Sequence, residues 1–176
     1  VRYSAELCDR YIDSLIREIH IVGSRYTKRK KVTGLYFGGG TPALAADRIK
    51  GIVDALNEHF IITEGIGLEL HPDNVNAKVL QMLKDAGVTK ISIGIQSFSD
   101  KHRTVLGRKK IDTAKMLSAL SSVPFETVSM DFIFALPGQT YDDLKSDIDT
   151  AFSLGANHVA IYPFIDFTFT ESPVAA

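Results

Sequence analysis

Two carboxylates interrupt apolar strand patterns in this sequence, at positions where side chains are normally buried. Glu69 lies between two leucines, and Asp131 lies between Met130 and Phe132. A carboxylate among apolar neighbours needs either a polar partner in the protein or a ligand, because burying an unpaired charge is costly. Both residues are therefore candidates for binding a polar small molecule, and structural pairing, for Glu69 with a basic neighbour, is the alternative.

A glycine-rich turn could meet the same ligand with its backbone. Gly38, Gly39, Gly40 and Thr41 follow an apolar stretch and are followed by Pro42 and a helical pattern. Without Cβ atoms in the way, backbone N–H groups can approach a polar ligand closely. The turn lacks the spacing of a dinucleotide fingerprint and the Gly-Lys-Ser/Thr ending of a phosphate loop. A tight turn without a ligand is the alternative interpretation.

Two further polar residues become candidates only by their position. Gln96 ends an otherwise apolar strand pattern, where a satisfied buried amide is equally reasonable. Arg108 lies in a basic stretch and, taken alone, indicates a surface cation. The functional interpretation of both depends on whether the fold brings them to Glu69 and Asp131.

The elements that must position these residues alternate along the chain. Apolar residues at helical spacing predict a first helix over 5–26, and strands rich in Val, Ile and Phe alternate with later helices, which predicts a parallel sheet covered by helices. We expect strands near 32–38, 65–71, 90–96, 127–134 and 158–163, and further helices near 45–60, 79–87, 100–106, 112–121 and 141–154.

The spacing of the polar positions predicts one shared edge. Gly40, Glu69, Gln96, Asp131 and Tyr162 follow one another at intervals of 27 to 35 residues. Each interval suits one right-handed strand-helix-strand crossover, so these positions should lie along one edge of one sheet, where barrels of this class build their active sites. A complete eight-unit barrel needs roughly 250 residues. The fold class is therefore α/β, a partial (β/α) TIM-like barrel with five parallel strands.

Composition excludes some functions. A formal net charge of -1 gives no electrostatic case for nucleic acid or an anionic membrane as a partner. The basic run at 28–31 is expected to be a solvated turn after the first helix. The first residues lack the pattern of a signal peptide, so we expect a cytoplasmic protein. The single cysteine, Cys8, cannot by itself ligate an iron–sulfur cluster.

Several motifs together resemble those of radical S-adenosylmethionine (SAM) enzymes of the oxygen-independent coproporphyrinogen III oxidase type. The motifs are Gly-Gly-Gly-Thr-Pro at 38–42, Ser-Ile-Gly-Ile-Gln-Ser-Phe at 92–98 with Leu-Gly-Arg at 106–108, and Met-Asp-Phe-Ile-Phe-Ala-Leu-Pro-Gly-Gln-Thr at 130–140. The resemblance extends from the first helix to the fifth strand. It implies that the 38–41 turn contacts the amino-acid end of SAM and that Glu69, Gln96, Arg108 and Asp131 lie in the cofactor pocket.

The resemblance also implies a [4Fe-4S] cluster, which cleaves SAM to generate a 5'-deoxyadenosyl radical. The family holds this cluster with a C-x-x-x-C-x-x-C loop upstream of the first helix. Cys8 lies inside the helical pattern and is expected to be a packed thiol. We therefore expect residues 1–176 to be the central part of one core domain, lacking the first strand, the cluster ligands and any C-terminal domain, and inactive alone.

The substrate is left open between three hypotheses. The first is oxidation and decarboxylation of a porphyrin-like substrate such as a porphyrinogen, the second is haem handling by a chaperone of the same family, and the third is a non-radical α/β domain that binds a small molecule. Phe164, Phe167 and Phe169 either line an apolar pocket or belong to the core. His71 has no histidine at ligand spacing and is expected to be a loop residue, so we assign no metal ligand and no catalytic residue.

Overall fold

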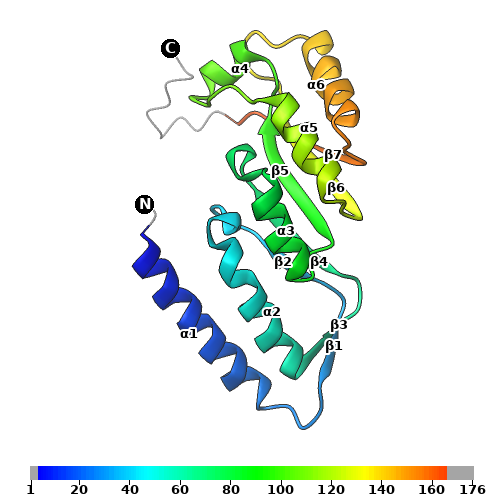
Figure 1. The fold of residues 1–176 in the computed structure, drawn as a ribbon. Coiled ribbons are helices and arrows are strands. Elements are labelled where there is room, and N and C mark those ends of the chain that lie inside the picture. The colour runs from blue at the N-terminus through cyan, green and yellow to red at the C-terminus, as the bar shows by residue number, and fades with distance from the viewer. Residues whose placement is uncertain (1–3, 166–176) are drawn as a thin grey trace.

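One curved, parallel sheet forms the centre of the computed structural model, which describes residues 4–165 (Figure 1). Its five strands lie in the order β2-β4-β5-β6-β7, and every neighbouring pair is parallel. The predicted sequential order without reversal is confirmed, as is the partial barrel. The strands are β2 (Leu35–Phe37), β4 (Ile66–Leu70), β5 (Lys90–Gln96), β6 (Thr127–Phe134) and β7 (His158–Pro163).

Helices connect the strands, and Figure 1 shows α1, α2, α3 and α5 following one another on one side of the strands. Their bounds are α1 (Ala5–Gly23), α2 (Ala46–His59), α3 (Ala77–Asp85), α4 (Asp100–Val105), α5 (Thr113–Ser122) and α6 (Tyr141–Ser153), with the short 3-10 turns η1 (Pro42–Ala45) and η2 (Pro72–Asn74). Side chains begin several of them by accepting from backbone amides of the first turn: Ser4, Asn76, Asp112 and Thr140. Each such cap replaces a hydrogen bond that the helix cannot make internally.

The two faces of the sheet differ in chemistry because successive side chains of a strand point to opposite faces. Leu68, Ile93, Met130 and Phe132 are fully buried in the core. The alternate positions of the same strands carry the polar residues of the opposite face. Because of this alternation, the side chains of Glu69 and Asp131 lie on the face opposite the helix-covered core.

The strand predicted over 32–38 is divided in two. Residues 30–32 form β1 (Lys30–Val32), which pairs with β3 (Phe60–Ile62) in a separate two-stranded parallel sheet. Gly34 and Gly65 lie between the two pairings, and Gly65 has φ +97°. The prediction of a solvated turn over 28–31 is therefore wrong for Lys30 and Lys31, which pair as strand while their side chains stay exposed.

Some sequence predictions fall at the end of the chain. Phe164 is half-buried after β7, whereas Phe167 and Phe169 lie outside the described residues. Within residues 4–165, no helix is both long and apolar enough to cross a membrane.

Replacing Leu83 with alanine tests the core beneath the sheet. The side chain of Leu83 is 0% exposed, so Leu83→Ala should lower the free energy of unfolding by about 2–5 kcal/mol through lost burial and a residual cavity. Urea titration followed by circular dichroism measures the change. Leu117→Ala on α5, whose side chain is 41% exposed, is the matched control and should change stability by less than about 1 kcal/mol. Equal losses in the two variants would contradict this assignment of the core.

Candidate functional site

A polar pocket of about 360 Å³ lies at the C-terminal ends of the strands. It is lined by Gly39, Gly40, Thr41, Glu69, Leu70, His71, Ser92, Gly94, Gln96, Arg108, Asp131 and Tyr162. Seven of the eight residues predicted from the sequence are in this lining, and the eighth, Gly38, lines an adjoining cavity of about 420 Å³ with Cys8. The structure therefore brings the predicted residues together, while their role in binding a cofactor stays a prediction.

Glu69 holds the glycine-rich turn in place. Its Oε2 accepts a hydrogen bond from the Gly39 backbone N–H at 3.1 Å. A Cβ atom at Gly38 would lie 3.1 Å from Oε1 of Glu69, and Gly39 has φ +103°, so both positions favour glycine. The partner of Glu69 is thus a backbone amide rather than the basic side chain of the alternative interpretation, and its negative charge is not neutralised by that partner.

Asp131 is held by two serine hydroxyls. Ser92 Oγ lies 2.9 and 2.7 Å from the two carboxylate oxygens of Asp131, and Ser129 Oγ donates to Oδ1 at 3.2 Å. Ser129 also lies 3.0 Å from Nδ1 of His158. Asp131 therefore has polar partners within the protein, and its contact with a cofactor stays a prediction. The serines are neutral, so these partners bring no positive charge to Asp131.

The phenol of Tyr36 lies close to both carboxylates on the polar face of the sheet, and its pKa responds to them. Partial burial of its ring raises the pKa of the phenol, and the nearby charges of Glu69 and Asp131 raise this pKa further. A Cβ at Gly67 would lie 2.6 Å from Cδ2 of Tyr36, so the ring occupies the space that this glycine leaves. The raised phenol pKa is the response expected of an acid next to two carboxylates.

A bulge at the end of β5 directs Gln96 to the pocket. The pairing with β6 passes from Ile93 opposite Met130 to Gln96 opposite Phe132, so β5 uses one residue more than its partner strand. Gln96 has φ +70°, and its Nε2 would lie 3.1 Å from a Cβ placed on Gly94. A non-glycine residue in this conformation is strained, and such strain concentrates at functional sites.

Arg103 attaches the loop that carries Arg108 to the end of β5. Its guanidinium is buried and donates to the carbonyl oxygens of Ile95 at 2.7 Å and Ser97 at 3.0 Å, while its Nε donates to the carbonyl of Lys109. Burial lowers the pKa of Arg103, and the positive charge of Arg108 lowers it further. The sequence analysis missed Arg103, because hydrogen bonds to backbone carbonyls leave no residue-type pattern.

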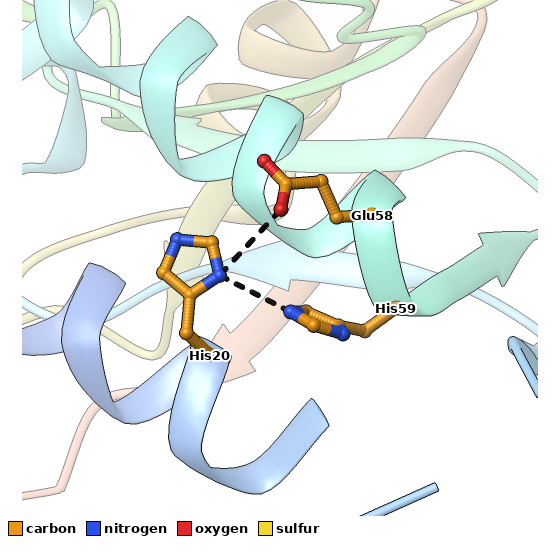
Figure 2. Close-up of side chains that lie close together, drawn as sticks. All are labelled: His20, Glu58 and His59. Atoms are coloured by element: carbon orange, nitrogen blue, oxygen red, sulfur yellow. Dashed lines mark hydrogen bonds and ion pairs between the residues drawn. The ribbon is translucent and has the colours of Figure 1, made fainter. Parts of the chain in front are cut away.

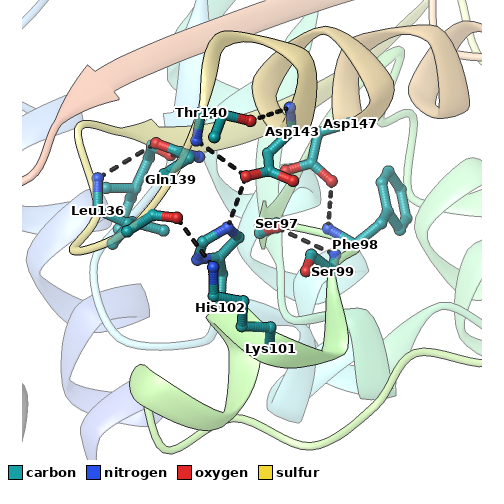
Figure 3. A network of polar contacts seen from close by, with 12 residues as sticks. Ser97, Phe98, Ser99, Lys101, His102, Leu136, Gln139, Thr140, Asp143 and Asp147 are labelled. Carbon is teal, nitrogen blue, oxygen red and sulfur yellow. Dashed lines mark hydrogen bonds and ion pairs between the residues drawn. The ribbon is translucent and has the colours of Figure 1, made fainter.

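A second polar network fixes the residues that follow β5, and Figure 3 shows it. Asp147 of α6 is buried and accepts from the Phe98 N–H at 2.7 Å, while its Oδ2 has no hydrogen-bond partner among the described residues. Burial raises the pKa of Asp147. His102 is also buried, and its Nε2 lies 3.4 Å from Oδ2 of Asp143. These contacts hold α6 against the loop after Gln96.

Pocket residues that the sequence analysis did not assign come from the same strand ends. His71 lines the pocket, accepts from the Asp73 N–H at 3.3 Å and has its pKa lowered chiefly by burial, which favours a neutral imidazole. Ser92 lines it through its position beside Asp131. The signal for His71 was its place directly after the strand that carries Glu69.

Comparisons with known proteins bear on the family and the fold of the chain. The family profile described as "Radical SAM superfamily" matches residues 9–151. The chain is 33% identical over 163 residues to the heme chaperone HemW of Bacillus subtilis, covering 89% of this chain and 43% of that protein. It is 24% identical over 161 residues to the oxygen-independent coproporphyrinogen III oxidase of Pseudomonas aeruginosa, covering 88% and 35%.

A solved structure shows the same fold. Coproporphyrinogen III oxidase (HemN) from Escherichia coli, described as a radical SAM enzyme, superposes with a TM-score of 0.84 at 23% identity, covering 99% of this chain and 41% of that one. The chain thus spans less than half the length of these three proteins.

Changing Asp147 to asparagine should stabilise the protein in a pH-dependent way. The raised pKa means that the folded state binds the Asp147 proton more tightly than the unfolded state does. The favourable contribution is therefore complete below the unfolded pKa of 3.8 and is lost as the pH rises through the folded pKa. Asp147→Asn should accordingly be more stable than the wild type at neutral pH, and the difference should shrink as the pH falls toward about 4. Urea unfolding across this range measures it.

Asp149→Asn is the control on the same helix. Asp149 forms an exposed ion pair with Lys145, so its replacement should change stability by less than about 1 kcal/mol. A variant at position 147 that is less stable than the wild type at every pH would show that the carboxylate is required there.

Proposed function

The chain belongs to the radical SAM superfamily, and on that premise we propose that the polar pocket binds S-adenosylmethionine in a protein that handles a tetrapyrrole. The observation that carries the proposal is the set of charged groups in one pocket at the strand ends. We propose further that the chain is the central part of the core domain of a longer protein.

The charges of the pocket complement those of the cofactor. SAM carries an ammonium, a carboxylate and a sulfonium group, so its net charge is positive. The pocket offers the carboxylates of Glu69 and Asp131 against the single guanidinium of Arg108. Its volume of about 360 Å³ falls in the range of small-molecule sites. The residues present therefore fit this cofactor.

Each group has a role consistent with its chemistry. The backbone of the turn at 39–41 would contact the amino-acid end of SAM, and Arg108 would pair with its carboxylate through charge-assisted hydrogen bonds. Glu69 and Asp131 would accept from the donor groups of the ligand, and Gln96 can both donate and accept. Because backbone amide and serine hydroxyls hold the two carboxylates, binding requires little reorganisation of the site.

The sequence does not contain the ligands of an iron–sulfur cluster. When bound beside a reduced iron–sulfur cluster, SAM supplies the radical chemistry of this superfamily. Such a cluster needs three thiolates, and the only cysteine of the sequence, Cys8, is half-buried against the core. The residues of this chain do not fit the cluster, and we propose that its ligands lie outside the sequence.

Two tetrapyrrole activities remain, and they have unequal support. Haem handling is supported by the chaperone at 33% identity, and oxidation of a coproporphyrinogen-like substrate is supported by the oxidase at 24%. We favour haem handling because the more similar relative carries that name.

Asp131→Asn tests the cofactor proposal in the intact protein. The substitution keeps the shape of the side chain and can still accept from Ser92, but it removes the charge. Loss of one charge-assisted hydrogen bond should weaken SAM binding by roughly 1.5–3 kcal/mol, or about tenfold to a hundredfold. Calorimetric titration of SAM measures affinity, and melting curves without SAM measure stability, which should change less.

Asp149→Asn, on the exposed face of α6, is the matched control and should bind SAM like the wild type. Unchanged affinity in Asp131→Asn would remove Asp131 from the binding site. A large loss of stability with unchanged affinity in the folded fraction would make its role purely structural.

Haem binding separates the two activities. We expect the intact protein, titrated with haem without oxygen, to bind one equivalent with a shifted Soret absorption band. With SAM and a reductant, it should release no carbon dioxide from coproporphyrinogen III. Decarboxylation of coproporphyrinogen III would favour the oxidase, and absence of both results would exclude tetrapyrrole handling without affecting the SAM measurement.

A further inference from the structure

Two histidines and a glutamate converge where the C-terminal ends of α1 and α2 meet, as Figure 2 shows. Nδ1 of His20 lies 3.1 Å from Nε2 of His59 and 3.7 Å from Oε2 of Glu58. One ligand atom from each residue lies within 4.8 Å of the other two. None of the three residues lines the pocket assigned to SAM.

The spacing of the two imidazole nitrogens suits a common metal ion. Zn–N bonds are about 2.0–2.1 Å long, so two nitrogens on one tetrahedral ion lie roughly 3.3 Å apart. The 3.1 Å between His20 and His59 is close to this value, and Oε2 of Glu58 lies 3.7 Å from Nδ1 of His20. Imidazole is a borderline ligand, so two histidines favour zinc and its neighbours over Mg²⁺ or Ca²⁺, and a carboxylate is a common third ligand of zinc.

We propose that His20, Glu58 and His59 bind a divalent transition-metal ion, with Zn²⁺ as the principal candidate. Three protein ligands leave the fourth tetrahedral position for water. The side chains of His20 and Glu58 are 43% and 64% exposed, so an ion can enter from solvent. The competing arrangement is a hydrogen bond between the two imidazoles with no ion.

A close approach of the helices fixes the orientation of the His59 ring. A Cβ atom at Gly23 would lie only 2.1 Å from Cγ of His59, so the ring occupies the space above this glycine. The ring of Phe60 also contacts it edge-on, with the ring centroids 6.4 Å apart. These contacts fix the orientation of the His59 ring, whose Nε2 faces His20.

The ion would complete the connection between α1 and α2. Near their N-terminal ends, Arg48 of α2 pairs with Asp9 and with Asp13 of α1, the latter at 2.9 Å. At their C-terminal ends, the ion would join residues of both helices. A ligand that binds only the folded state stabilises it, so zinc should raise the melting temperature.

Zinc titration of the tag-free protein, after removal of metals with EDTA, tests the proposal. Competition with a chromogenic chelator should show one Zn²⁺ bound per chain. His20→Gln and His59→Gln should each lower the affinity at least tenfold, and Glu58→Gln should lower it less. His158→Gln retains all three ligands and should bind zinc like the wild type. Co²⁺ should give the visible absorption of a tetrahedral site in the wild type and not in the His20 or His59 variants.

Gly23→Ala tests the geometry without changing a ligand. Its methyl group would overlap the His59 ring, so zinc affinity should fall while the melting temperature in EDTA shows whether the variant is folded. Absence of a one-to-one zinc complex with the wild type would overturn the proposal. So would zinc binding that persists undiminished in both histidine variants, because the ion would then bind elsewhere on the surface.

Discussion

Parallel pairing in register is the constraint on which the pocket depends. Glu69 lies opposite Ser92, Ser92 opposite Ser129, and Ser129 opposite His158, so four neighbouring strands contribute to one polar row. A slip of one residue in any strand would exchange this row for the buried aliphatic residues of the other face. The large energy of the apolar core therefore fixes where the polar groups lie, although those groups contribute little to the core themselves.

The two carboxylates accept hydrogen bonds from donors that carry no charge. A cation next to Glu69 or Asp131 would have neutralised the pocket, whereas the Gly39 amide and the Ser92 hydroxyl hold them without doing so. Neutral donors also avoid the desolvation of a second buried charge. Both carboxylates also act on Tyr36, because its phenol pKa is raised first by burial and then by the charges of Glu69 and Asp131. A cationic ligand would be attracted to the two carboxylates, and this is the physical reason for proposing a sulfonium cofactor at this site.

The features that depend on the periodicity of residue types could be predicted from the sequence. Those that depend on one local break in a strand or on one contact between distant residues could not. Runs of Val, Ile and Phe located all five strands of the main sheet, and their spacing placed Glu69 and Asp131 at one edge. The break between β1 and β2 at Gly34 was missed because an apolar run that contains one glycine still has the pattern of a single strand. Arg103 was missed because its acceptors are backbone carbonyls. His20 and His59, 39 residues apart, have no motif that joins them, and only the packing of two helices does.

The two proposed sites are related through α1 rather than through chemistry. This helix has 19 residues, so its ends lie about 28 Å apart. His20 lies near its C-terminal end, whereas Cys8 and Tyr11 of its first half line the cavity next to Gly38. None of the three proposed metal ligands lines the pocket assigned to SAM, so the ion would not contact a ligand there. Because a helix is stiff, fixing its C-terminal end restricts the angle at which its first half meets the glycine-rich turn. The ion would therefore act only on the shape of the cavity next to Gly38.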